Sequence, residues 1–166
     1  MATSQGAKAN SAGCGAEDHI AGFLISHGYQ ELDSVERKEL NRDIKEGYDP
    51  VEALSDYGPK VFCQQVAGYR TLYGKRHKHD FLAYDKSKHK KGLVIEMKWQ
   101  TANGSVDEKL PFIVYSFKRL SVSTALLVMD GGGIRQVAVD WAVNESDGKF
   151  QAFPSIGAFS RWLRTH

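Results

Sequence analysis

The sequence has no long hydrophobic run. A membrane-spanning helix needs about 20 consecutive apolar residues, and no stretch of this 166-residue chain approaches that length. The first residues, MATSQGAKANSAGCG, also lack the apolar segment that is typical of a secretory signal peptide. We therefore expect a cytoplasmic protein without a membrane partner.

Cysteine is also scarce. Cys14 and Cys63 lie far apart, and neither has a second cysteine near it at the spacing of a metal site. This pattern excludes a disulfide framework and a zinc knuckle, and it fits a reducing compartment.

Charge of one sign is not in large excess, because the net charge is only +2. A balance this small does not by itself mark a nucleic-acid-binding protein. The positive charge is uneven, however: two basic clusters, YRTLYGKRHKHD and DKSKHKKG, lie on either side of one short apolar segment. Such clusters form either a solvated basic face or a surface that contacts phosphates.

The pattern along the chain predicts one mixed α/β domain over residues 15–166, after a small, polar leader at 1–14 that we expect to be disordered. Helical spacing and end signals predict helices that close at Gly28 and Gly47, the second opened by Ser34. A third is expected after Ser105, which forms a capping box with Glu108. Strands are expected at 61–73, 79–85, 92–100 and near 123–130. Residues 134–148 fit helix or strand, and a short strand and a helix from about Ser155 end the chain.

The stretch GLVIEMKWQ (residues 92–100) is composed like a buried strand, yet it contains two charges. Residues two apart in a strand share a face, so Glu96 and Lys98 point the same way. Half-buried charges are costly unless they pair or bind something charged. An ordinary ion pair and a binding site are both open at this point.

The preceding strand brings a second carboxylate. If the two strands pair as a hairpin across the turn KSKHKKG, so that paired residue numbers sum to about 176, Asp80 lies beside Glu96. Carboxylates at close range repel, and a divalent cation relieves the repulsion. Oxygen ligands favour Mg²⁺ or Mn²⁺. Beside a metal-bound water, the Lys98 ammonium can orient the nucleophile or stabilise the charge on a phosphoryl group.

These motifs, HDFLAYD followed by IEMKWQ, resemble the PD-(D/E)xK nuclease superfamily over roughly residues 17–130. Asp80 stands for the motif aspartate and Glu96-Met97-Lys98 for the E-x-K, while His79 replaces the usual proline. The resemblance implies a restriction-endonuclease-like core of order αβββαβ, with a central mixed sheet flanked by helices. It also implies a Mg²⁺-dependent enzyme, Mn²⁺ substituting, in which Asp80 and Glu96 bind the metal and Lys98 acts in catalysis.

The same resemblance adds further site residues. Glu17 matches the first-helix glutamate that serves as a metal ligand in the family, although it also fits an ordinary acidic residue at a helix N-terminus. Gln100 continues the face of Glu96 and Lys98, and it resembles the glutamine that contacts the nucleophilic water or a phosphate. Lys109 opposes the dipole of its helix and is a candidate phosphate contact.

Other polar residues receive more ordinary interpretations. Further phosphate contacts are expected around the site from Arg70, Lys75, Arg76, Lys88, Lys90 and Lys91. His77 and His79 lack a nearby third zinc ligand, so phosphate contact or surface placement is favoured. Asp85 alternates away from Asp80 and fits a hairpin end. Gly131–Gly133 lack the GK[ST] ending of a phosphate loop and read as a turn.

The leading hypothesis is a DNA endonuclease most like a small type II restriction enzyme, leaving a 5′-phosphate. One domain carries one site, so cutting double-stranded DNA requires a homodimer or a partner subunit. A structure-specific nuclease, such as a junction resolvase or the cleavage subunit of a mobile-element or phage-defence system, fits the same fold. The third hypothesis is a non-catalytic nucleic-acid-binding module.

Overall fold

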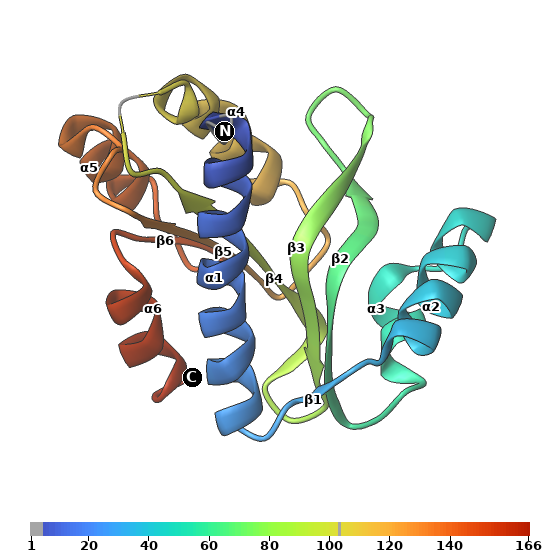
Figure 1. Ribbon diagram of the computed structural model, residues 1–166. Coiled ribbons are helices and arrows are strands. Elements are labelled where there is room, and N and C mark those ends of the chain that lie inside the picture. The colour runs from blue at the N-terminus through green and yellow to red at the C-terminus, as the bar shows by residue number, and fades with distance from the viewer. Residues whose placement is uncertain (1–4, 103) are drawn as a thin grey trace.

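The computed structural model describes residues 5–102 and 104–166, with side chains from Gly15 onward. Its centre is a mixed six-stranded sheet of order β1-β2-β3-β4-β5-β6 (Figure 1). The strands are β1 (Gln30–Glu31), β2 (Lys60–Arg70), β3 (Arg76–Asp85), β4 (His89–Trp99), β5 (Thr124–Asp130) and β6 (Phe150–Phe153). Strands β2 to β4 are antiparallel neighbours, and the β1–β2, β4–β5 and β5–β6 pairs are parallel. This is the α/β architecture that the sequence predicted.

Helices cover both faces of the sheet, each over its own apolar core. The first face, called here the α1 side, carries α1 (Gln5–Ser26) and α6 (Ile156–Leu163). The second, called the α4 side, carries α2 (Ser34–Glu46), α3 (Pro50–Ser55), α4 (Val106–Lys118) and α5 (Gln136–Asn144). The ambiguous segment 134–148 thus contains helix α5 and no strand, and Val139 and Ala142 of this helix are buried in the α4-side core.

The helix ends agree with the sequence in part. Gly47 closes α2 in a left-handed conformation, as expected, but the N-cap is Asp33, which forms a capping box with Glu36. The capping box expected at Ser105 and Glu108 is wrong: Ser105 lies at φ −85° and ψ 8°, not in the extended conformation that an N-cap uses, and its side chain caps none of the described amides.

Helix α1 begins at Gln5, so its backbone runs through part of the segment 1–14 for which we expected disorder. The segment contains several alanines, the residue with the highest helix propensity, and these favour extension of a helix already anchored by packing further along. Residues 1–4 and the side chains up to Cys14 lie outside the described part.

The hairpin of β3 and β4 has the register that the sequence predicted. Phe81 pairs with Ile95, Leu82 with Val94 and Ala83 with Leu93, so the paired residue numbers sum to 176. At the turn, Asp85 accepts hydrogen bonds from the amides of Ser87 and Lys88, which is the expected hairpin-end role. This register sets Asp80 level with Glu96.

Strands β2 and β3 both depart from simple alternation at one level of the sheet. Cys63 and Val66 are three residues apart, yet both belong to the α4-side core, and Gln65 between them has φ +58°. On β3, Leu82 pairs with Cys63 and faces the α4 side, so alternation predicts that Asp80, two residues earlier, faces that side too. His79 is there instead, with its ring 5.6 Å from that of Phe117. The irregularity frees Gln65 and Asp80 from the core.

The edge of the sheet beside β2 is covered unevenly. Strand β1 pairs only with Val61 and Phe62. Further along, Ala67 donates its backbone N–H to the side chain of Asn41 on α2 at 3.0 Å. A helix side chain therefore occupies a position that a neighbouring strand would otherwise take.

In residues 5–102 and 104–166, no helix is long and apolar enough to cross a membrane.

Candidate nuclease active site

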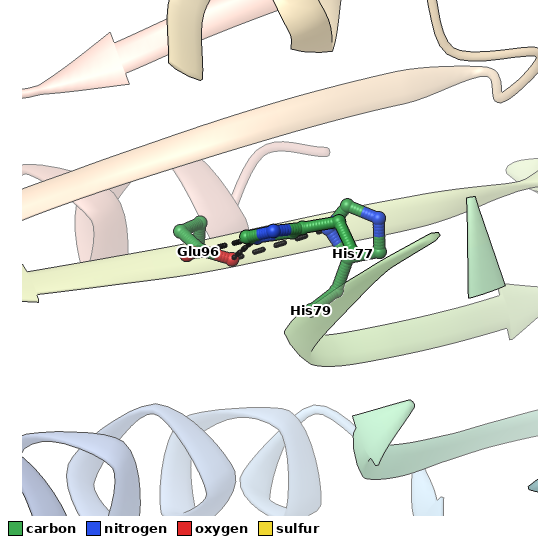
Figure 2. Close-up of side chains that lie close together, drawn as sticks. All are labelled: His77, His79 and Glu96. Atoms are coloured by element: carbon green, nitrogen blue, oxygen red, sulfur yellow. Dashed lines mark hydrogen bonds and ion pairs between the residues drawn. The ribbon is translucent and has the colours of Figure 1, made fainter. Parts of the chain in front are cut away.

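Glu96 is the most enclosed charged group of the site. It lies on β4 and is 3% exposed. Its Oε1 accepts a hydrogen bond from Lys98 Nζ at 2.5 Å, and His77 Nε2 lies 3.3 Å from both of its carboxylate oxygens. His79 Nδ1 is 3.9 Å from Oε2, and Figure 2 shows both histidines beside the carboxylate. With Lys98, three side chains thus surround one carboxylate.

These contacts keep Glu96 ionised. Burial alone raises the pKa of a carboxyl group, but here the His77 hydrogen bond and the charge of Lys98 outweigh burial and lower the pKa of Glu96. The alternate placement of Glu96 and Lys98 on one strand therefore makes a direct ion pair. From the sequence, the two charges could form either an ion pair or a binding site. The ion pair seen here is compatible with a binding site at the same residues.

Asp80 has the opposite electrostatic environment. Its Oδ2 accepts a hydrogen bond from the backbone N–H of Met97 at 2.7 Å, while Oδ1 has only a 3.5 Å contact with Gln65 Nε2. Burial and the negative charge of Glu96 raise the pKa of Asp80 to about 6, against the attraction of Lys98. One oxygen of this carboxylate is thus weakly bonded and close to a second negative charge, which is a favourable arrangement for a cation.

Glu17 reaches the same region from α1. Its Oε2 accepts a 3.0 Å hydrogen bond from Gln65 Nε2, the same nitrogen that contacts Asp80. Burial raises the pKa of Glu17, and Glu96 adds to this effect, against the Gln65 hydrogen bond. Gln65 thus links the two carboxylates. The sequence did not single it out, because no spacing rule predicts a left-handed residue within a strand.

Gln100 does not join this group. Its side-chain amide donates to the carbonyl of Gly133 at 3.0 Å, and its backbone carbonyl accepts from the N–H of Gly133. Gly131, at φ +97°, allows this approach, since a Cβ there would lie 2.5 Å from the Gln100 carbonyl oxygen. The glycine run is a turn, as expected, and it holds Gln100 beyond the end of β4.

The basic residues divide between two ends of the sheet. Arg70 and Lys75 lie at the β2–β3 turn, where Arg70 Nη1 donates to the carbonyl of Gly74. Arg76 donates to the carbonyl of Ile44 at 3.0 Å, near the C-terminal end of α2. Lys88, Lys90 and Lys91 are exposed at the β3–β4 turn, beyond the opposite end of β3 from that hairpin tip.

Lys88, Lys90 and Lys91 therefore do not lie close around Glu96, and their expected phosphate contacts stay a prediction. Six residues separate Lys90 from Glu96 along β4, which is about 20 Å at the rise of a strand. Lys109 is exposed in the first turn of α4, near the end of β4 that carries Lys98.

His79 corrects a second expectation. Surface placement was favoured from the sequence, yet His79 is 2% exposed and lies between Glu96 and the rings of Tyr69 and Phe117. Burial lowers its pKa to about 4, against the attraction of Glu96, so the ring is neutral at pH 7. The change of face on β3 puts this ring inside, and simple alternation cannot predict it.

Comparison with known families agrees with this geometry. The model of the PD-(D/E)XK nuclease superfamily domain matches residues 8–157, most of the chain. The chain belongs to the PD-(D/E)XK nuclease superfamily. No curated protein and no solved structure matches it. As a superfamily member it is a nuclease-type domain, and such nucleases typically depend on divalent metal ions.

The PD-(D/E)XK residues present here suit such an ion. Asp80, Glu96 and Glu17 offer only oxygen, the ligand type that Mg²⁺ and Mn²⁺ prefer. The raised pKa values of Asp80 and Glu17 reflect burial and, next, repulsion from the Glu96 carboxylate, which a bound cation would oppose. The donor types therefore suit a hard divalent metal, but among the described residues the ligand atoms that lie within 4.8 Å of one another are those of His77, His79 and Glu96, not those of the three carboxylates.

Proposed function

We propose that the protein is a Mg²⁺-dependent endonuclease that hydrolyses phosphodiester bonds of double-stranded DNA and leaves a 5′-phosphate, as restriction-type enzymes do. One observation carries the proposal: the weakly bonded Asp80 oxygen lies in a site that also holds Glu96 and Lys98. A module that only bound DNA would gain nothing from buried carboxylates in mutual repulsion.

Asp80, Glu96 and Glu17 are the residues that would hold the metal. Bound Mg²⁺ supplies Lewis-acid polarisation of a phosphoryl oxygen and lowers the pKa of a coordinated water. The chain itself fixes its ligands: the Met97 N–H holds one oxygen of Asp80, and the Lys98 ammonium holds one oxygen of Glu96.

Lys98 has a second task. An ammonium has three N–H donors, and Glu96 Oε1 accepts one of them. The others can orient an attacking water or stabilise the negative charge that develops on the phosphoryl group. Lys98 is also partly exposed, with 23% of its side chain accessible, so substrate can reach it.

Cleavage of both strands requires two such sites. Each chain provides one Asp80, one Glu96 and one Lys98, so a homodimer or a partner subunit would supply the second set. Lys75 at the hairpin tip and Lys109 on α4 are exposed, and both would contact the phosphates of a duplex that enters the site.

The test is cleavage of supercoiled plasmid with Mg²⁺, with Mn²⁺ or with EDTA. We expect metal-dependent cutting, and we expect Lys98→Ala to lower its rate about 100-fold or more, the loss typical when one preorganised electrostatic group is removed. Lys38→Ala, at an exposed position on α2, is the matched control and retains activity. Thermal melting of each variant verifies its folding.

The substrate panel separates the two nuclease hypotheses. Discrete fragments from plasmid DNA support restriction-type cleavage, whereas cutting confined to branched junctions supports a structure-specific nuclease. Equal cutting by the wild type and Lys98→Ala contradicts the role of Lys98. DNA binding without cutting under every metal condition contradicts the proposed enzyme.

A further inference from the structure

We infer that His77, His79 and Glu96 form a binding site for a transition-metal ion such as Zn²⁺, which shares Glu96 but not Asp80 with the proposed Mg²⁺ site. The three ligand atoms lie within 4.8 Å of one another (Figure 2). The two histidines alternate on β3 and point toward one carboxylate on the adjoining strand β4.

The distances are close to those of a coordinated ion. In a tetrahedral zinc site with bonds of about 2.0–2.1 Å, neighbouring ligand atoms are about 3.4 Å apart. His77 Nε2 lies 3.3 Å from Glu96 Oε2, and His79 Nδ1 lies 3.9 Å from the same oxygen. Small rotations of the two rings would bring all three donors to coordination distance.

The buried ring of His79 is the observation that an ordinary hydrogen-bond network does not explain. Neither of its nitrogens has a hydrogen-bond partner in the described part of the chain, although the residue is 2% exposed. Buried polar groups left in this state are rare and destabilising. A structural role would be filled better by an apolar ring, whereas a metal ion at Nδ1 gives the imidazole a partner.

The donor chemistry separates this site from the proposed Mg²⁺ site. Two imidazoles and one carboxylate suit Zn²⁺ and its neighbours in the first transition series, while Mg²⁺ prefers oxygen alone. Three protein ligands leave a fourth position for water, and 33% of the His77 side chain is exposed, which gives solvent a route. Lys98 contacts Oε1 of Glu96, so the ion would bind on the Oε2 side, away from the ammonium.

Glu96 is common to both sites, and this has a regulatory consequence. An ion held by Oε2 and the two imidazoles would compete with Mg²⁺ for the carboxylate that the proposed catalysis needs. Zn²⁺ would then inhibit cleavage even when Mg²⁺ is present. The inhibition rests on the proposed nuclease function, whereas metal binding does not.

Titration of the full chain with Zn²⁺, followed by calorimetry, and with Co²⁺, followed by visible absorption, tests the binding. We expect one ion per chain and the intense visible bands of four-coordinate Co²⁺. Loss of an outer-shell partner alone weakens zinc binding about 10- to 100-fold, so His77→Gln and His79→Phe should each weaken it by about 100-fold or more. His19→Gln, which changes an exposed histidine on α1, should bind as the wild type does.

Asp80→Asn distinguishes the two metal sites. It should keep the Zn²⁺ and Co²⁺ signals, because Asp80 is not among the three ligands. The inference is overturned if the wild type binds neither ion, if His77→Gln and His79→Phe both bind as tightly as the wild type, or if Asp80→Asn loses the ion. A protein that binds Zn²⁺ as expected but cleaves no DNA supports the site and contradicts only the nuclease proposal.

Discussion

At the scale of one residue, the ionised carboxylate of Asp80 lowers the free energy of unfolding of the protein. Its carboxylate is partly buried near Glu96, so ionisation is unfavourable in the folded chain. In the unfolded chain the same carboxylate is hydrated and far from other charges. The free energy of unfolding therefore falls as pH rises through the raised pKa of Asp80, near 6, and the full stability is present only below the ordinary pKa of aspartate.

Replacing Asp80 with Asn should stabilise the metal-free protein. An asparagine oxygen can still accept the Met97 N–H, while the unfavourable charge is removed. We expect a gain on the order of 1–2 kcal/mol in the free energy of unfolding at pH 8 and about half of that at pH 5, because each unit of pKa shift corresponds to about 1.4 kcal/mol and pH 5 lies midway between the ordinary and the raised pKa. Urea denaturation in EDTA at both pH values measures it.

Asp18→Asn is the control, because Asp18 is exposed on the same helix as Glu17. A stability gain for Asp80→Asn that is equal at pH 5 and pH 8 would contradict the electrostatic explanation. Added Mg²⁺ should stabilise the wild type and leave Asp80→Asn nearly unchanged.

Residue-level features were predictable from the sequence where they followed from the period of a strand. The shared face of Glu96 and Lys98 is one example, because it needs only alternation within β4. The contacts of His79 and Gln65 were not predictable, since both depend on a local break in alternation that leaves no mark in residue type. We expected Gln100 to lie in the site with Glu96 and Lys98. Its side-chain amide instead donates a hydrogen bond to the Gly133 carbonyl in the neighbouring glycine turn.

At the scale of elements, the irregularities of β2 and β3 turn the side chains of Gln65 and Asp80 away from the α4-side core, which regular alternation would not do. A regular β2 would turn Gln65 toward the α4 side, away from Glu17 on α1. Its φ of +58° instead lets the amide contact Glu17 and Asp80 together. Left-handed backbone at a residue other than glycine costs on the order of 1 kcal/mol, so this strand is strained where it meets the site.

Substitution at this position should reveal the strain. Gln65→Val should lower the free energy of unfolding by about 1–3 kcal/mol, because a β-branched side chain tolerates positive φ poorly. Gln64→Val, one residue earlier in the same strand but without positive φ, is the matched control and should change stability by less than about 0.5 kcal/mol. Urea denaturation compares the two, and equal losses would argue against backbone strain at Gln65.

Element boundaries were predicted well where side chains carry the signal. Gly47 ends α2 as predicted. The turn after Asp85 sets the register of the hairpin, and the paired residue numbers sum to 176, as predicted. The start of α4 after Ser105 was predicted correctly, but the capping box was not, because a capping box requires a particular backbone geometry as well as particular residue types. Ser105 has the right residue type in the wrong conformation.

At the scale of the whole molecule, the two basic clusters of the sequence lie at opposite ends of β3. The hairpin-tip group, Lys75 and Lys78, precedes Asp80 by a few residues, and the turn group, Lys88 and Lys90, is exposed at the other end. The sequence could predict the two clusters and the α/β fold that carries them. It could not say which cluster lies near the site, because that depends on how a hairpin runs in space.

DNA affinity measured against salt concentration should tell the two groups apart. Each lost phosphate contact lowers the salt slope by about 1. Lys75→Ala with Lys78→Ala should therefore lower the slope by about 2 and weaken binding to every sequence alike, whereas Lys88→Ala with Lys90→Ala should change it by less. Equal changes from the two pairs would place the duplex along the whole length of β3.

The hydrogen bond from the Ala67 N–H to the Asn41 side chain affects how readily another chain can pair with the edge of the sheet. An exposed strand edge invites another chain to add its own strand, which is a route to aggregation, and natural proteins block such edges with side chains or helices. Strand β1 covers the start of β2, and Asn41 occupies a backbone donor further along. The contacts at Val61, Phe62 and Ala67 therefore reduce the length of β2 that another polypeptide could pair with.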